Sequence, residues 1–115
     1  DVERSRGLGD VYKRQESMDS MNDEIASGAK YLSTANVDAI AYLCTTGSFY
    51  KGPGWDNQMC DIIQQHSGVP GIATSPSAVE GLKEMGARKV SIATPYPTGT
   101  MSSYGNIFRP PDLQF

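Results

Sequence analysis

Residues 39–56, AIAYLCTTGSFYKGPGWD, set the architecture that we predict for this 115-residue chain. A short apolar run bounded by turn signals predicts a buried strand over residues 39–43. The run ends at Cys44, which opens a turn crowded with hydroxyl groups and glycines, and a helix-start signal follows. Because open α/β sheets bind ligands at the carboxyl ends of their strands, this segment predicts a site with a thiol and several backbone N–H groups.

The flanking sequence alternates between helical and strand patterns. Apolar residues at three- and four-residue spacing predict one amphipathic helix over residues 17–34. The elements predicted after the cysteine turn are a helix from Trp55 or Asp56 to Gly68, a strand over residues 69–74, a helix capped by Ser75 with Pro76 at its first position and Gly86 at its end, and a strand over residues 89–94. The α-β-α-β-α-β order predicts an α/β fold with a parallel three-layer αβα sheet. Three strands are few for such a sheet, so we expect an incomplete single lobe.

The two ends of the chain lack this organisation. Residues 1–15, DVERSRGLGDVYKRQ, have no consistent helix or strand period and resemble a recurrent translation of sequencing-adapter DNA. We interpret them as a non-native segment; the alternative is a disordered basic tail. Residues 99–115 contain turn formers and a Pro-Pro pair without amphipathic period, which predicts an irregular tail. Residues 16–98 therefore form the predicted partial lobe.

Composition and charge exclude several classes of function. The formal net charge of -3 argues against a nucleic-acid surface. No apolar run approaches the roughly 18 residues of a membrane span, and no secretory signal is recognisable. Cys44 and Cys60 are interpreted as reduced thiols, which predicts a cytoplasmic location. With His66 as the one histidine and no cysteine–histidine cluster, no metal site is expected.

The residues around Cys44 could bind and activate a small anion. A thiol followed by many N–H donors has its thiolate form favoured. Thr45, Thr46 and Ser48 offer hydroxyl groups, and Gly47 lets the backbone approach a ligand closely. Such a nest suits a carboxylate or an enolate oxyanion. The alternative is that Cys44 is a small buried hydrophobic residue, as most free cysteines are.

Tyr96 is a candidate from a second segment. It stands between two prolines after the predicted strand 89–94, where its hydroxyl could reach the same site. The alternative is a rigid aromatic side chain in a turn.

The sequences CTTGSFYKGPGWD (residues 44–56) and GVPGIATSPSAVEGLKEMGARKVSIATPYP (residues 68–97) together resemble a known family. They are similar to the first lobe of the aspartate/glutamate racemase superfamily, in the branch of the maleate cis-trans isomerases and arylmalonate decarboxylases. The similarity covers about residues 22–97. Its specificity comes from the joint occurrence of three motifs at these spacings: Cys-Thr-x-Gly-Ser, Gly-Pro-Gly-Trp-Asp and Ala-Thr-Pro-Tyr.

The resemblance implies a two-lobed enzyme whose active site lies between pseudo-symmetric halves, each usually offering a cysteine. Cys44 matches the cysteine of the first lobe, Thr45 and Thr46 match positions that help to bind a carboxylate or enediolate, and Tyr96 matches a tyrosine that joins them. In arylmalonate decarboxylases the position of Cys44 is typically glycine. A cysteine there favours isomerase or racemase chemistry.

Two parts of the family pattern are missing, namely the opening strand before residue 22 and the second lobe after residue 97. Cys60 cannot replace the second-lobe cysteine, because it follows the first motif on the next helix. We therefore expect a fragment of a cofactor-independent, cysteine-dependent isomerase or racemase acting on a small carboxylic acid. The alternatives are an arylmalonate decarboxylase-like enzyme, a non-catalytic flavodoxin-like anion-binding module, and a polypeptide that is inactive alone. No nucleic-acid or membrane partner is expected, and a truncated sheet edge favours homo-oligomer formation.

Overall fold

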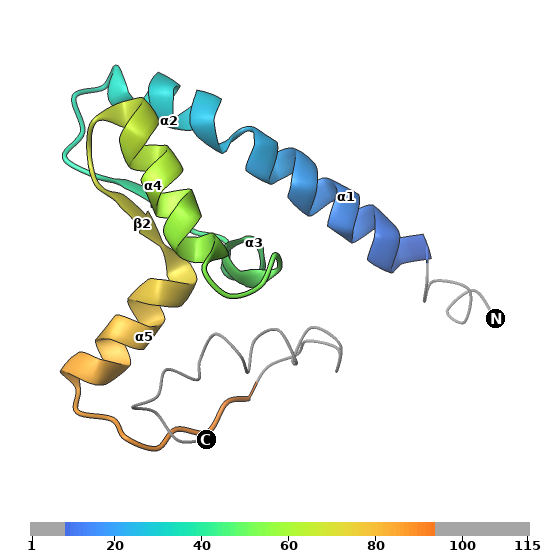
Figure 1. Cartoon of the computed structure of the whole chain (residues 1–115), viewed down its shortest axis with the longest axis vertical. Coiled ribbons are helices and arrows are strands. Elements are labelled where there is room, and N and C mark those ends of the chain that lie inside the picture. The colour runs from blue at the N-terminus through green and yellow to red at the C-terminus, as the bar shows by residue number, and fades with distance from the viewer. Residues whose placement is uncertain (1–8, 94–115) are drawn as a thin grey trace.

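The computed structural model describes residues 9–93, with their side chains from residue 16 onward. The helices and strands in this range are α1 (Gly9–Asp23), α2 (Ile25–Ser33), β1 (Ile40–Tyr42), α3 (Thr45–Phe49), α4 (Trp55–Ser67), β2 (Gly71–Ala73) and α5 (Thr74–Glu84) (Figure 1). No helix in the described range is both long and apolar enough to cross a membrane.

The two strands form a parallel sheet in which Ile40 is paired with Gly71 and Tyr42 with Ala73. The crossover between them contains α3 and α4, as a parallel connection requires. Gly71 allows α4 to approach the sheet, because an ideal Cβ at this position would lie 2.8 Å from the Cβ of Ile63. The predicted α/β class with a parallel sheet is confirmed, and both strands lie inside their predicted ranges.

One face of the sheet carries the hydrophobic core. Successive residues of a strand point to opposite faces, so Ile40 is buried while Ala41 is exposed. The buried cluster joins α2, α4 and the two strands through Ile25, Ala29, Ile40, Met59, Ile63 and Ala73. Helix α4 lies across β2, with α2 beside it (Figure 1). This packing fixes the carboxyl end of β1, where Cys44 follows.

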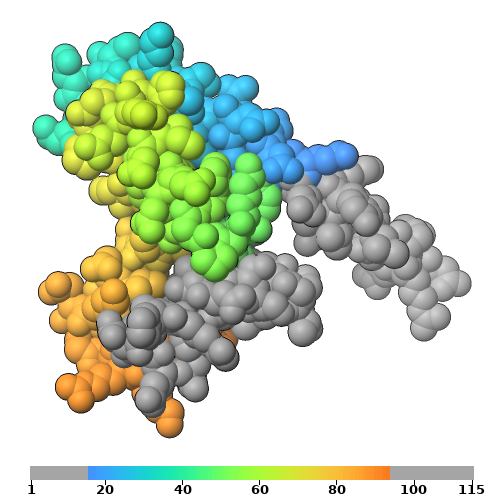
Figure 2. Space-filling model, in the orientation of Figure 1, coloured from blue at the N-terminus to red at the C-terminus, as the bar shows by residue number. Residues whose placement is uncertain are grey.

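The opposite face of the sheet is open within the described residues. Ala41, Leu43 and Ile72 are exposed on it, and Leu43 is 84% exposed. The second helical layer of a three-layer sheet is thus not formed by residues 9–93. Figure 2 shows that α5, the orange segment at the lower left, extends away from the body formed by α2 and α4.

The predicted strand over residues 89–94 was wrong for the residues that the structure describes. Only Lys89 forms an isolated bridge, and residues 90–93 have no regular secondary structure. The apolar side chain of Ile92 is instead packed against the buried pair Phe49 and Val79. Ile92 is partly buried by this contact without strand pairing, so the segment after α5 packs against α3 and α5 and does not form a third strand.

The predicted single helix over residues 17–34 was also wrong. It is two helices that meet at Glu24, and α1 begins at Gly9, inside the segment expected to lack a helical period. The hydroxyl group of Ser27 donates to the backbone carbonyl and to the carboxylate of Glu24, at 3.0 and 2.8 Å. Such local side-chain bonds offer the backbone an alternative to the regular helical ladder, and they coincide with the break.

The helix ends follow the predicted signals in part. Helix α4 begins at Trp55, and Gly68 ends it with a φ of 79°, both as predicted. Helix α5 begins at Thr74, two residues earlier than predicted, so Ser75 lies within the helix and Pro76 is its third residue. Proline is tolerated there because the first four N–H groups of a helix have no partner within it.

Residues 1–8 and 94–115 lie outside the described range. The interpretation of residues 1–15 as non-native, the limits of the partial lobe at residues 16 and 98, and the irregular tail over residues 99–115 all stay predictions.

Candidate active site

Cys44 lies where β1 ends and α3 begins. It is the N-cap residue of α3, with an extended backbone (φ −122°, ψ 108°), and its side chain is half-buried. The backbone N–H of Gly47 donates to Cys44 Sγ at 3.4 Å. The sequence predicted an irregular turn here, but residues 45–49 are helical because the thiol and the Cys44 carbonyl both accept N–H groups of the first helical turn. Cys44 Sγ therefore lies beside the backbone N–H groups of the first turn of α3.

Three further predicted site residues share this first turn. Thr45 and Thr46 are half-buried, and Gly47 is buried. The structure thus brings Cys44, Thr45, Thr46 and Gly47 together at the carboxyl edge of the sheet. The N–H groups at the start of a helix have no partner within it, so this turn presents donors beside the thiol.

Ser48 lies differently from these neighbours. Its side chain is fully buried, and its hydroxyl oxygen is 2.6 Å from that of Ser75, which is also fully buried. The Ser48 oxygen also accepts the backbone N–H of Ser75 at 3.3 Å, and its hydroxyl group donates to the Thr45 carbonyl at 2.8 Å. The hydroxyl of Ser48 therefore joins α3 to the start of α5. Tyr96, the remaining predicted site residue, lies outside the described range.

Tyr42, a neighbour of Cys44, and its partner Asn22 were missed by sequence reasoning. The Tyr42 hydroxyl group donates to Asn22 Oδ1 at 2.9 Å. Burial, and then the charge of Cys44 and a hydrogen-bonding contact with it, raise the pKa of Tyr42 to about 12. The alternation of strand side chains was the available signal, since Tyr42 precedes Cys44 by two residues and shares its face of the strand.

A second tyrosine anchors the far end of α3 to α1. The Tyr50 hydroxyl group donates to the carboxylate of Asp19, and Lys51 forms an ion pair with the same carboxylate at 3.6 Å. Burial first, and then the bond to Asp19, raise the pKa of Tyr50 to about 12. The Lys51 ammonium group lies 4.5 Å from the ring centroid of Trp55, whose Nε1–H donates to the Gly47 carbonyl at 3.0 Å. These contacts join α3 and the residues after it to α1 and to the start of α4.

Cys60 is in a different environment from Cys44. It lies half-buried on α4, and burial, followed by the carboxylates of Asp56 and Asp61, raises the pKa of its thiol. A raised pKa makes a thiol less reactive at neutral pH. Of the two cysteines, Cys44 alone lies in the first turn after β1.

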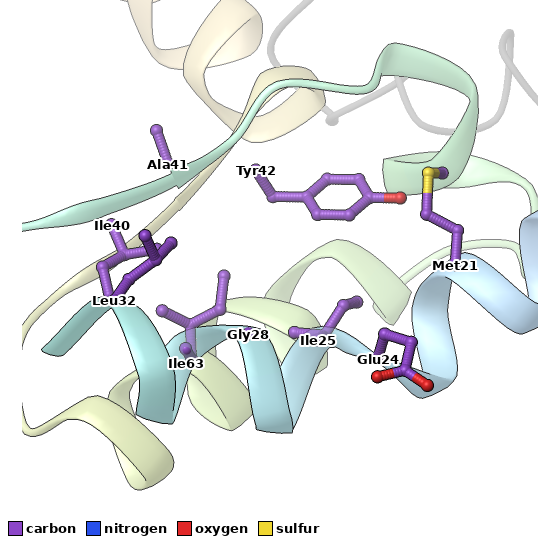
Figure 3. A pocket seen from close by; sticks show the side chains of 10 residues that line it. Met21, Glu24, Ile25, Gly28, Leu32, Ile40, Ala41, Tyr42 and Ile63 are labelled. Atoms are coloured by element: carbon purple, nitrogen blue, oxygen red, sulfur yellow. The ribbon is translucent and has the colours of Figure 1, made fainter. Parts of the chain in front are cut away.

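An apolar hollow of about 200 Å³ lies between α2 and β1 (Figure 3). Its lining consists of Met21, Glu24, Ile25, Gly28, Ala29, Leu32, Ile40, Ala41, Tyr42 and Ile63. In Figure 3 the ring of Tyr42 lies along β1 with its hydroxyl group directed toward α1 and α3. Cys44 does not line this hollow, so the thiol and the hollow are separate features that share Tyr42. Among the described residues, no group of three or more His, Cys, Asp or Glu side chains could hold a metal ion.

The fold and this site define a parallel α/β protein with a cysteine at the transition from a strand to a helix. The chain belongs to the arylmalonate decarboxylase family, because the model of that family matches residues 3–103. It lies in the maleate isomerase and arylmalonate decarboxylase branch of the aspartate/glutamate racemase superfamily.

Among curated proteins, the chain is similar to a maleate isomerase of Geobacillus stearothermophilus, with 28% identity over 91 residues that cover 75% of this chain and 36% of the relative. It is also similar to an arylmalonate decarboxylase of Bordetella bronchiseptica, with 27% identity over 90 residues, 78% of this chain and 37% of the relative.

Among solved structures, the maleate isomerase from Pseudomonas putida S16 matches with a TM-score of 0.78 and 21% identity, over 86% of this chain and 42% of that chain. A crystal structure of arylmalonate decarboxylase matches with a TM-score of 0.76 and 21% identity, over 84% of this chain and 44% of that chain. The chain thus spans about two fifths of the length of these relatives, which fits a single lobe.

Proposed function

We propose that this chain is part of a cofactor-independent enzyme that acts on a small carboxylic acid, with Cys44 as its reactive thiol. The observation that carries the proposal is the bond from the Gly47 N–H to Cys44 Sγ at the start of α3, in a chain whose relatives include a maleate isomerase. The sulfur lies beside N–H donors that stabilise negative charge. Because the chain spans about two fifths of its relatives, the activity belongs to a longer protein.

In the favoured reaction, a thiolate at Cys44 adds to one carbon of an alkene that is conjugated to a carboxylate. The electron pair of the C=C bond moves toward the carboxylate and gives an enediolate, and the remaining C–C single bond can rotate. Expulsion of the thiolate restores the double bond in the trans form. The first-turn N–H groups of Thr45 and Thr46 are suited to stabilise the enediolate oxygens while they carry the additional charge.

Racemisation uses the same thiol as a base. Cys44 would remove a proton from the carbon beside the carboxylate, and a second acid would return a proton to the opposite face. The described residues place no second thiol in this turn, so this route needs a group from outside them.

Decarboxylation of an arylmalonate is the second candidate, and the family match supports it. Loss of carbon dioxide also leaves an enediolate, which the same N–H groups would stabilise. Cys44 would not add to the substrate in that reaction. The two candidates therefore differ in product and in the part played by the thiol.

The test uses the longer protein that carries this chain, recovered by extending the reading frame in its source DNA. Maleate and phenylmalonate are supplied separately, and proton NMR follows the appearance of fumarate or phenylacetate. We expect fumarate, and we expect Cys44→Ser to lower turnover by about three orders of magnitude or more. Cys60→Ser is the matched control and should leave turnover near that of the parent. Unchanged turnover in Cys44→Ser would remove Cys44 from the reaction, and phenylacetate alone would favour decarboxylation.

A further inference from the structure

Tyr42 and Cys44 point toward the same small volume. Tyr42 is the last residue of β1, and the extended backbone of Cys44 places the two side chains on one face. Both converge on Gly47, whose N–H donates to Cys44 Sγ. An ideal Cβ at Gly47 would overlap the Tyr42 hydroxyl oxygen. The phenol oxygen and the thiol thus both lie beside Gly47, and Tyr42 has a hydrogen-bonding contact with Cys44.

On its other side the phenol is bonded to Asn22. The Tyr42 hydroxyl group donates its one proton to Asn22 Oδ1, so it presents only lone pairs to the thiol. Asn22 is 6% exposed, and its Nδ2 is buried with no hydrogen-bond partner among the described residues. A buried amide N–H without a partner costs free energy, so in this orientation the amide is satisfied at Oδ1 and unsatisfied at Nδ2.

We propose that Tyr42 and Asn22 form a hydrogen-bond relay that reverses its direction when Cys44 loses its proton, which makes Tyr42 a positioning residue for the thiolate. While Cys44 is a thiol, its S–H faces the lone pairs of the phenol, and the phenol donates to Asn22 Oδ1. When the thiol proton leaves to solvent, the phenol turns its own proton toward the negative sulfur. The phenol keeps one proton throughout.

The reversal is completed by Asn22. A rotation of 180° about the last bond of the side chain exchanges Oδ1 and Nδ2 without changing the volume that the amide fills. Nδ2 then donates to the Tyr42 oxygen and Oδ1 gives up the proton that it had accepted, so the amide keeps one hydrogen bond to Tyr42 in either orientation. The phenol remains a proton donor over the neutral range because its pKa is raised to about 12.

The neighbouring charged groups do not provide a competing proton. The charge of Tyr50 raises the pKa of Tyr42, and a hydrogen-bonding contact with Asn22 lowers the pKa of Tyr50, but the proton of Tyr50 itself is donated to Asp19. The carboxylate of Asp19 is paired with Lys51, and Asp23 adds negative charge on the side of Tyr50. The Tyr42 hydroxyl is a side-chain donor that has a hydrogen-bonding contact with Cys44.

The relay rests on the proposed function only because that function makes the Cys44 thiolate the reactive group. Its test does not measure enzyme activity. The rate of iodoacetamide labelling is measured against pH for the 115-residue chain. Trypsin cleavage after Lys30, Lys51 and Lys83 separates Cys44, in peptide 31–51, from Cys60, in peptide 52–83, so mass spectrometry follows each thiol. Tyr42→Phe is compared with Tyr31→Phe, which removes the same hydroxyl from a side chain that is 78% exposed.

We expect Tyr42→Phe to move the midpoint of the Cys44 labelling profile upward by about one pH unit, equivalent to about tenfold slower labelling below the midpoint. The profiles of Cys60 and of Tyr31→Phe should match the parent. The sign decides the issue. If the phenol proton stayed on Asn22, removing the hydroxyl would take away only lone pairs, and the midpoint would fall or stay in place; either result would overturn the relay.

Asn22→Leu gives a second test. In the relay this substitution removes one hydrogen bond between residue 22 and Tyr42 from the thiol state of Cys44 and one from the thiolate state. The midpoint of the Cys44 labelling profile should therefore move little, and a clear fall would contradict the relay. A third measurement needs no substitution: the side-chain amide signals of Asn22, followed by ¹H–¹⁵N NMR in the parent chain, should shift with the midpoint of Cys44 labelling. Signals that do not respond across that range would overturn the proposal even if both variants failed to fold.

Discussion

Tyr42 and Gly47 fit together so closely that position 47 has no room for a side chain. An ideal Cβ at Gly47 would overlap the Tyr42 hydroxyl oxygen and come within 3.0 Å of two ring carbons. The ring is fixed in turn by the bond from its hydroxyl group to Asn22. This pair sets the distance between the strand that carries Tyr42 and the helix that follows Cys44.

The first prediction concerns Gly47→Ala. The added methyl group must displace the Tyr42 ring or the start of α3, and overpacking of this kind typically costs about 1–3 kcal/mol. We expect the free energy of unfolding, measured by urea denaturation, to fall by that amount.

Gly28→Ala is the matched control. Gly28 lies in α2, where an ideal Cβ would meet no atom within 4 Å. Since alanine is favoured over glycine in a helix by about 0.5–1 kcal/mol, this variant should be slightly more stable than the parent. Equal effects of the two substitutions would contradict the steric relationship between Tyr42 and Gly47.

The second prediction concerns the buried serine pair. Ser48→Ala leaves the buried Ser75 hydroxyl without its partner, so it should lower the free energy of unfolding by about 1–3 kcal/mol. Ser75→Ala should cost less, because the Ser48 hydroxyl keeps its bonds to the Thr45 carbonyl and to the backbone N–H of residue 75. The double variant removes both hydroxyls, and we expect it to cost clearly less than the sum of the two. A double-mutant cycle measures this coupling. Strict additivity would show that the two hydroxyls do not depend on each other.

Local sequence signals predicted much of the fold. Some signals determine the structure only of the residues next to them: the apolar run of β1, the start of α4 at Trp55, and the glycine at position 68. The elements that they predicted lie where the sequence placed them. The break at Glu24 and the packing of Ile92 on Phe49 depend on competing or distant contacts. The spacing of apolar residues carries no information about local side-chain bonds or about distant packing partners. The long helix and the third strand were therefore predicted wrongly.

The candidate site also has residues that the sequence could place and one that it could not. Cys44, Thr45, Thr46 and Gly47 are consecutive, so any fold that placed one at the strand end placed the others beside it. Asn22, on α1, bonds to Tyr42, on β1, across twenty positions of sequence. No spacing rule links them, so the neighbour that bonds to Tyr42 could be found only from the structure.

The third prediction compares two contacts of the segment that follows α3. Lys51 is paired with Asp19 and lies over Trp55, but both charged side chains are over a third exposed, so Lys51→Met should change stability by less than about 1 kcal/mol. Trp55→Phe removes the N–H that donates to the buried Gly47 carbonyl, and we expect it to cost about 1–3 kcal/mol. Thermal unfolding of the two variants shows which substitution lowers stability more. A larger loss in Lys51→Met would mean that the ion pair, and not the bond from Trp55, is the stronger contact of α3.

The last prediction concerns alkaline pH. In the folded chain the pKa values of Tyr42 and Tyr50 are raised to about 12, by burial first in both cases, from an ordinary value near 10. Between these values the unfolded chain has released phenol protons that the folded chain retains. The stabilisation is therefore complete below about pH 10 and is lost as the pH rises through about 12. The free energy of unfolding should decline over this window in the parent and in Tyr31→Phe, and less steeply in Tyr42→Phe, which has one fewer perturbed phenol. Parallel declines in all three chains, measured by urea denaturation at each pH, would mean that Tyr42 ionises alike in the folded and unfolded states.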